Sequence, residues 1–149
     1  MKSVLVAFIN SIALLLLATL LNSAHADELE SLIIGKWHTP NKDGIIQITQ
    51  QDNKNYSGTI IGGKGDPKRK DNLNPDPALK ERLLVGTTIL QNLHYAGQGK
   101  WHEGTIYDPN NGKTYSCRVE LKDSQTLQIR GFIGVSLFGR TDTWTRITE

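Results

Sequence analysis

The most constraining feature of this chain is an alternation of apolar and polar residues with a period of two, which recurs over short runs after residue 32. Such alternation indicates strands with one buried face, and the glycines, asparagines and prolines between the runs suit tight hairpin turns. A helical apolar stripe is almost absent from this part of the sequence. The runs that we predict as strands are 33–38, 45–51, 56–61, 87–95, 99–107, 114–121, 126–133 and 142–148.

Eight short antiparallel strands must either protect two sheet edges or close on themselves. The short links between most of the runs favour closure by consecutive hairpins. We therefore predict an all-β fold: a single small antiparallel up-and-down β-barrel of about eight strands, in one domain over residues 27–149. A barrel of this size is either filled by side chains or holds one small ligand, and both cases give the same alternation.

Residues 62–86 break the pattern with charges, glycines and prolines. Asp76 followed by Pro77 predicts the start of a helix, and residues 78–83 are suited to continue it for one or two turns. This connection is much longer than the usual loop of about 4–6 residues, and long loops in small domains are often functional. It is the first place to look for a site.

The N-terminal segment resembles a secretory signal peptide. Lys2 precedes an apolar run over residues 4–21, and Ala24-His25-Ala26 forms a small-x-small cleavage site. We expect cleavage after Ala26, a periplasmic or secreted protein, and no stable membrane insertion after the signal peptide, residues 1–26, is removed. An uncleaved anchor is the alternative, because the apolar run is close to the ~20 residues that span a bilayer.

The net charge limits the possible partners of the protein, and the cysteine content limits its disulfides. The formal net charge of +2 is too small to draw the protein onto nucleic acid or an anionic membrane by bulk electrostatics, so any charged partner must be met locally. Cys117 is the only cysteine, so no disulfide within the chain can form. Its alternation with Tyr115 and Val119 predicts a buried position on an apolar strand face.

Several motifs together carry a resemblance to a known family. They are Gly35-Lys36-Trp37, the run over residues 71–77 with Arg82-Leu83-Leu84-x-Gly86, the turn over residues 106–115, and the closing segment over residues 130–146. In this order and spacing they resemble domain-of-unknown-function family 2147 over almost all of residues 33–148. The family usually has Arg-Pro-Leu where this chain has Arg82-Leu83-Leu84. The resemblance implies an exported bacterial protein with a lipocalin-like β-barrel and no assigned activity.

A looser similarity links the chain ends to lipocalin-type barrels. Those barrels carry Gly-x-Trp on the first strand and a late arginine that packs over the tryptophan, and Gly35, Trp37 and Arg146 match these positions. The indole would plug one barrel end while the guanidinium stacks on its face. We therefore give Trp37, Trp144 and Arg146 structural roles.

Metal and cofactor signatures are weak. Asn72, Asn74 and Asp76 alternate like the start of a calcium loop, but Pro77 replaces its glycine and Leu83 its glutamate. A weaker oxygen-ligand site at this connection stays open, although helix capping explains the same residues more simply.

The histidines that follow the signal segment, His38, His94 and His102, lack zinc spacing, unless strands bring His38 and His102 together at one barrel end. A serine nucleophile motif is also missing. We predict no metal and no cofactor.

Two segments have alternative interpretations. The apolar stretch 131–139 is expected to be barrel core, with an exposed patch at the barrel mouth as the alternative. The basic cluster Lys64, Lys68, Arg69 and Lys70 reads as a solvated loop, or as a lid that attracts an anionic ligand or the negative envelope surface.

Our leading functional hypothesis is a non-enzymatic exported binding protein that holds a small apolar or amphipathic molecule in or across the barrel mouth. The candidate ligand-binding residues are Asn74, Asp76, Arg82, Tyr107, Arg130, Phe138 and Arg140. If Arg130 faces inward, it needs a carboxylate partner or an anionic ligand.

Two other classes stay open. A carboxylate-dependent enzyme on an envelope metabolite or glycan would gather Asp71, Asp76 and Asp108 in a cleft and raise the pKa of at least one of them. A protein–protein interaction module would bind an envelope protein through an exposed barrel face or edge strand. A filled barrel with an apolar outer patch would favour the interaction module.

Overall fold

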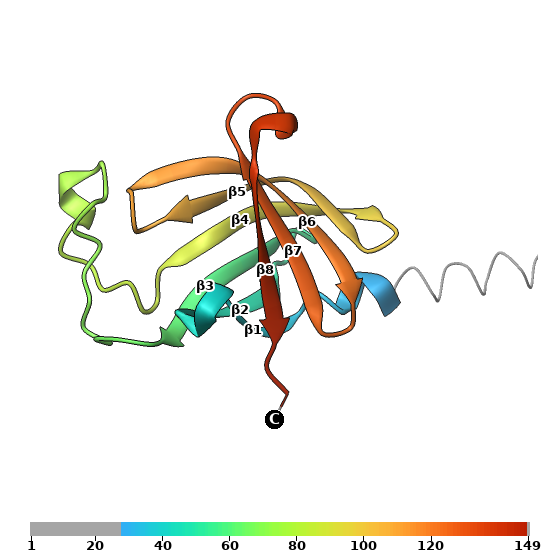
Figure 1. Cartoon of the computed structure of the whole chain (residues 1–149), viewed down its shortest axis with the longest axis horizontal. Helices are drawn as coiled ribbons and strands as arrows, with labels where there is room; N and C mark the ends of the chain where they lie inside the picture. Colours follow the sequence, from blue (N-terminus) through green and yellow to red (C-terminus); the bar gives the residue numbers. More distant parts are fainter. Residues whose placement is uncertain (1–27, 149) are drawn as a thin grey trace, which may run out of the picture.

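The computed structural model describes residues 28–148, which form a closed antiparallel β-barrel (Figure 1). Each strand pairs with the next, and β1 pairs with β8 to close the sheet. The strands are β1 (Gly35–His38), β2 (Gly44–Gln50), β3 (Tyr56–Gly63), β4 (Thr88–Gly97), β5 (Lys100–Asp108), β6 (Lys113–Asp123), β7 (Thr126–Phe132) and β8 (Arg140–Arg146). The predicted up-and-down barrel is confirmed, and every predicted strand end lies within two residues of the observed one.

The predicted signal peptide, residues 1–26, lies outside the described residues. Among the residues that are described, no helix is long and apolar enough to span a bilayer.

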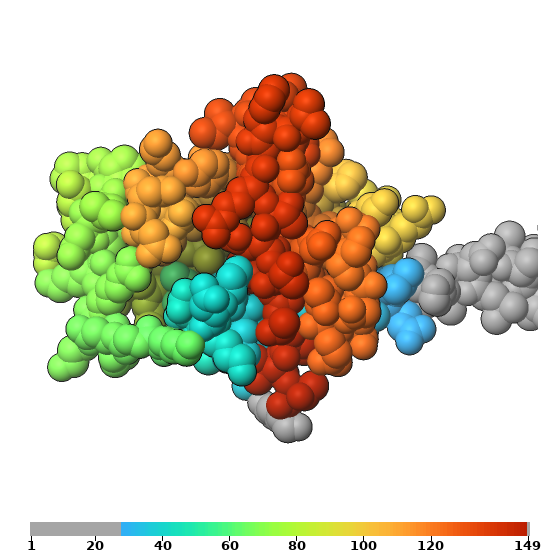
Figure 2. All heavy atoms as spheres, viewed as in Figure 1, coloured from blue at the N-terminus to red at the C-terminus, as the bar shows by residue number. Residues whose placement is uncertain are grey.

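The alternating strand directions give the barrel two different ends. The closed end carries the β2–β3, β4–β5 and β6–β7 hairpins and the N-terminal segment 28–34. The mouth end carries the loop 39–43 with the 3₁₀ turn η1 (Pro40–Lys42), the long connection 64–87, the β5–β6 turn and the β7–β8 loop. The long connection and the β7–β8 loop both project from the barrel (Figures 1 and 2).

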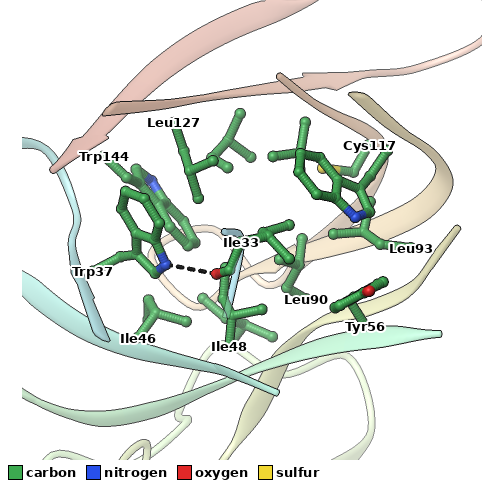
Figure 3. Packing of buried hydrophobic residues seen from close by; sticks show 14 of the residues in the cluster. Ile33, Trp37, Ile46, Ile48, Tyr56, Leu90, Leu93, Cys117, Leu127 and Trp144 are labelled. Atoms are coloured by element: carbon green, nitrogen blue, oxygen red, sulfur yellow. Dashed lines mark hydrogen bonds between the residues drawn. The ribbon is translucent and has the colours of Figure 1, made fainter. Parts of the chain in front are cut away.

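Large apolar side chains fill the barrel interior (Figure 3). Trp144 of β8 lies opposite Leu127 of β7, while Trp101 packs edge-on against Tyr56 with ring centroids 6.2 Å apart. The side chains without any water-accessible surface include Ile33, Trp37, Ile48, Leu90, Leu93, Trp101 and Leu127. A void large enough for a water molecule would expose the side chains that line it, so this part of the interior is filled.

The N-terminal segment seals the closed end. Trp37 donates a hydrogen bond from Nε1 to the backbone oxygen of Ile33 at 2.9 Å (Figure 3). The Arg146 guanidinium lies over the Trp37 ring, 4.1 Å from its centroid, and donates to the backbone oxygens of Ser124, Ile34 and Leu32. The pairing of a plug tryptophan with a late arginine, which the sequence suggested, is present.

Cys117 is buried on β6 and is not in a disulfide, as the alternation predicted. Burial raises the pKa of its thiol to about 12. The thiol therefore contributes to the core as a small apolar side chain.

The predicted helix in the long connection is shorter than expected. The 3₁₀ turn η2 spans only Pro77–Leu79, and the carboxylate of Asp76 caps it by accepting from the Ala78 N–H at 2.9 Å. The helix stops early because Leu83 forms an isolated antiparallel bridge with Lys70. The chain after η2 therefore turns back and pairs with residues 69–71, through this bridge and through backbone hydrogen bonds from Asp71 to Arg82 and from Leu84 to Arg69.

The assignment of the 131–139 stretch to the core is wrong. The ladder between β7 and β8 ends at Gly131 and Arg140, and Ile133, Val135, Leu137 and Phe138 beyond it are exposed. The loop forms the 3₁₀ turn η3 (Ser136–Phe138), and the positive φ of Gly134 bends the chain away from the barrel. The apolar composition therefore forms an outer patch.

Candidate functional site

Asp71 fastens the long connection to the barrel wall. Its carboxylate is fully buried, although it belongs to a charged loop. One oxygen accepts from the Tyr107 hydroxyl of β5 at 2.5 Å. The other accepts from the Asn74 amide at 2.7 Å and from Nε and Nη2 of Arg82 at 3.0 and 2.8 Å. Three of the predicted site residues, Asn74, Arg82 and Tyr107, therefore meet around Asp71, which our list of candidate ligand-binding residues did not include.

The neighbours of Asp71 hold it in its charged form. Burial alone would raise the pKa of this carboxyl, but the hydrogen bonds from Tyr107, Asn74 and Arg82 and the charge of Arg82 lower it instead. The pKa of Tyr107 is raised to about 12 by burial and by its hydrogen bond to the Asp71 charge. Asp71 is therefore an ionised acceptor, and Tyr107 is a neutral donor.

This arrangement suits anchoring better than acid–base chemistry. Both oxygens of Asp71 are engaged, and its lowered pKa is the opposite of what a general acid needs. The Arg82 guanidinium also lies 5.9 Å from the centroid of the Tyr107 ring, so the three side chains form one packed cluster. We call Asp71, Asn74, Arg82 and Tyr107 the Asp71 cluster.

The other carboxylates proposed for an enzyme have separate local partners. Asp76 caps η2, while its own backbone N–H donates to the Asn74 side chain at 2.9 Å. Asp108 accepts from the backbone N–H of Asn110 and the side chain of Asn111, both at 2.9 Å, and so caps the β5–β6 turn. The cleft of carboxylates that the enzyme hypothesis requires is not formed by these three residues.

A second group of predicted residues belongs to the β7–β8 loop. Arg130 donates from Nε to the Ser136 backbone oxygen at 2.8 Å and from Nη1 to the Thr141 hydroxyl at 2.9 Å. Arg140 pairs with Asp142 at 3.0 Å, and Phe138 is exposed. Arg130 alternates with buried Ile129 and bonds within its own loop, so it is not an inward arginine that awaits a ligand.

The long connection also packs against the β5–β6 turn. Arg69 donates from Nη2 to the Asn110 side chain at 3.0 Å. Gly112 has a φ of +71°, and a Cβ built there would lie 1.9 Å from the Leu73 backbone oxygen. Only glycine fits at this contact. The Asp71 cluster and the β5–β6 turn thus both hold the middle of the connection.

Exposed apolar side chains are concentrated at the mouth end. Of the nine large hydrophobic side chains that are exposed in the described residues, only Ile34 lies at the closed end. The other eight are Ile61 at the end of β3, Leu73, Leu83 and Val85 of the long connection, and Ile133, Val135, Leu137 and Phe138 of the β7–β8 loop. We call Ile61, Leu73, Leu83 and Val85 the rim.

The barrel wall has a polar groove that the sequence did not indicate. Its volume is about 310 Å³, and it lies near the β2–β3 hairpin. In the sequence, this hairpin is far from the predicted site residues of the β7–β8 loop. Amide and hydroxyl side chains dominate its lining, which consists of Gln51, Asn53, Asn55, Tyr56, Ser57, Thr88, Gln91 and Asn92. Tyr56 is buried, so the groove lacks an exposed aromatic face on which a ligand could stack.

His38 and His102 do not come together at one barrel end, the arrangement that we left open. His102 of β5 lies opposite His94 of β4, whereas His38 lies on β1 opposite Thr145. No group of three histidine, cysteine, aspartate or glutamate side chains in residues 28–148 is placed to hold a metal ion. Asn74 presents an N–H to Asp71, which further weakens an oxygen-ligand site there.

A family model described as "Uncharacterized protein conserved in bacteria (DUF2147)" matches residues 35–146. The chain belongs to this family. The matched range begins with the first residue of β1 and ends with the last residue of β8, so family membership covers the whole barrel. No curated protein matches the sequence.

Among solved structures, the barrel is similar to protein HP1028 from Helicobacter pylori, which is described as belonging to the lipocalin family. The TM-score is 0.71 at 25% sequence identity, over 78% of this chain and 83% of that one. The lipocalin-like barrel that the family resemblance implied is therefore shown.

Proposed function

We infer that this member of the DUF2147 family is a non-enzymatic binding protein of the bacterial cell envelope, which holds a small amphipathic molecule across the mouth end of its barrel. The observation that carries this proposal is the concentration of exposed apolar side chains at that end. Contiguous exposed apolar surface on a soluble protein commonly marks a binding site. The lipocalin-like fold supports a ligand-binding role, because small barrels bind ligands at their open ends.

The filled interior, which we expected of an interaction module, restricts a small ligand to a position on the rim. Trp37, Trp101 and Leu90 belong to the core that fills the barrel and have no water-accessible surface. An apolar ligand would therefore lie against side chains such as Leu73 and Leu83 at the surface.

The charge of the long connection favours a ligand with an anionic group. Six basic and four acidic side chains lie in residues 64–87. Asp71 is neutralised by Arg82, and Glu81 is paired with Lys70 at 2.5 Å. Lys68 and Arg69 have no carboxylate partner among the described residues. A ligand with an apolar body and a negative head would match this combination.

The Asp71 cluster supports the rim without contacting the ligand. It fixes the connection to β5, so the exposed apolar side chains on either side of it have a defined position. This division of roles also explains why the carboxylates have structural partners, which supports a non-enzymatic function.

Native mass spectrometry of the protein purified from its own host tests the proposal. We expect a bound small mass that is lost on denaturation. The double substitution Leu73→Ser and Leu83→Ser should reduce its occupancy at least tenfold, because two apolar contacts of roughly 1 kcal/mol each are lost. Ile34→Ser, at the closed end, is the matched control and should retain the ligand.

Two results would contradict the inference. Absence of any bound small mass would remove the carrier role. A bound protein subunit would favour the interaction module, for which the filled interior and the apolar outer patch are the features that we expected.

A further inference from the structure

The β7–β8 loop presents an apolar surface that nothing in the described chain covers. Ile133, Val135, Leu137 and Phe138 are 69, 60, 81 and 80% exposed. We call residues 133–139 the tip. It stands away from the barrel as the red loop at the top of Figure 1, and Figure 2 shows it protruding in the same view. Four large apolar side chains on one protruding loop form an interaction surface rather than a poorly packed piece of core.

Hydrogen bonds hold the tip in this outward arrangement. The Arg130 guanidinium spans it by donating to the backbone oxygens of Ser136 and Leu137 at 2.8 and 3.1 Å and to the Thr141 hydroxyl at 2.9 Å. Gly139 lies so close to β7 that a Cβ there would be 2.7 Å from the Gly131 backbone oxygen. The loop is therefore a built turn, and its apolar side chains are directed away from the barrel.

The base of the tip is basic. Arg118 of β6 and Arg130 of β7 lie directly opposite each other. Like charges in this position repel each other and destabilise the pairing of the two strands. Neither forms an ion pair with a carboxylate in residues 28–148, and Arg118 instead lies 5.5 Å from the centroid of the Phe132 ring. Arg140, which pairs with Asp142, is the third arginine at this position. An anionic surface would relieve the repulsion between Arg118 and Arg130.

We propose that the tip is a membrane-surface anchor, which docks the protein on an anionic lipid bilayer. Leu137 and Phe138 enter the boundary between headgroups and acyl chains, and the arginines at the base lie at the level of the lipid phosphates. A bilayer takes up apolar side chains in its interior and binds arginines at its phosphates at the same time. The tip, with its apolar end and the arginines at its base, matches these two layers. This anchor goes beyond the proposed function, because a ligand can bind the rim in solution without it.

Fluorescence of a Phe138→Trp variant with lipid vesicles tests the anchor. The native Trp37, Trp101 and Trp144 are buried, so the added indole is the one that responds to lipid. We use the chain from Asp27, which contains the whole barrel, with vesicles of phosphatidylglycerol and phosphatidylethanolamine or of phosphatidylcholine alone. We expect a blue shift and quenching by brominated acyl chains on the anionic vesicles, and a weaker response on neutral ones.

Co-sedimentation with the same vesicles measures the contributions of the side chains. The double substitution Leu137→Ser and Phe138→Ser should lower partitioning on the order of 100-fold. Its urea midpoint should remain unchanged, because both side chains are exposed. Arg118→Gln should lower partitioning onto anionic vesicles about fivefold. Ile34→Ser is the control at the opposite barrel end and should bind as the native chain does.

Three outcomes would overturn the proposal. One is partitioning of the double variant equal to that of the native chain, and another is equal binding to neutral and anionic vesicles. The third is no binding to either vesicle type, which would leave a protein surface as the partner of the tip. Ligand retention on the rim is measured separately by native mass spectrometry, so failure of the anchor and failure of the binding function are distinguishable.

Discussion

The Asp71 cluster offers the sharpest test of how the long connection is held, through the substitution Asp71→Asn. Asparagine keeps one carbonyl oxygen that can accept from Tyr107, but its amide group replaces the oxygen that accepts from Asn74 and Arg82. Donors then face donors, and the Arg82 charge loses its partner. Breaking a fully buried ion pair from one side costs about 3–5 kcal/mol.

The cost is smaller here because the Arg82 side chain is 36% exposed, so water recovers part of its solvation. We expect a loss of about 2 kcal/mol in the free energy of unfolding. With a urea dependence of about 2 kcal/mol per molar for a domain of this size, the urea midpoint falls by about 1 M. Proteolytic cleavage within residues 64–87 should also become faster, because the connection is released from β5.

The stabilisation that Asp71→Asn removes should depend on pH, and its sign follows from the pKa of Asp71. The pKa of Asp71 is lower in the folded protein than its ordinary value of 3.8. Its contribution to stability is therefore complete above that value and is lost as the pH falls through the folded pKa. Native and Asp71→Asn proteins should differ by a constant amount above about pH 5, and the difference should shrink as the pH falls from about 4 through the folded pKa of Asp71, which lies below 3.8.

The matched control for this experiment is Asp76→Asn, on the same connection. Asparagine caps a helix about as well as aspartate, so the free energy of unfolding should change by less than about 0.5 kcal/mol. An Asp71→Asn protein with the native midpoint and the native cleavage rate would refute the anchoring role.

Three further predictions concern the rest of the barrel. Arg146→Ala should lower the free energy of unfolding by about 2–4 kcal/mol, because it removes the stacking on Trp37 and the donors to three backbone oxygens. Arg146→Lys should recover only a minor part of this loss. Urea unfolding followed by tryptophan fluorescence measures both variants. Gly112→Ala should detach the β5–β6 turn from Leu73 and speed cleavage of the long connection, with little change in far-UV circular dichroism. Cys117 should react with a thiol reagent only at the rate of global unfolding, so rapid labelling of the native protein would disprove its burial.

The strands were predictable because each buries one face against a common core, which imposes an alternation that can be read locally. Cys117 and Val119 on β6 illustrate this, since both are buried where the period of two places them. The closing contact between Trp37 and Arg146 was accessible only through a resemblance, because it joins the two ends of the chain.

The site was harder to predict, for a different physical reason. Asn74, Arg82 and Tyr107 were each singled out, but the Asp71 carboxylate that joins them is separated from Tyr107 by 36 residues. The contact depends on how the connection folds back through the bridge between Lys70 and Leu83, and no local pattern encodes that path. The tip was assigned to the core because apolar composition usually indicates burial, yet composition does not reveal that the ladder ends before these side chains find a partner.

The seam between β1 and β8 has a consequence for the order in which the chain assembles. Only two residue pairs close the barrel there, Trp37 with Arg146 and His38 with Thr145, and the partners are separated by more than 100 residues. A growing chain can form its hairpins one after another, but the first strand has no neighbour on one side until the last strand emerges. Until then both outer strands are open edges that can pair with another molecule. Loss of the last few residues would therefore leave a curled sheet prone to aggregation, even though most of the core residues would still be present.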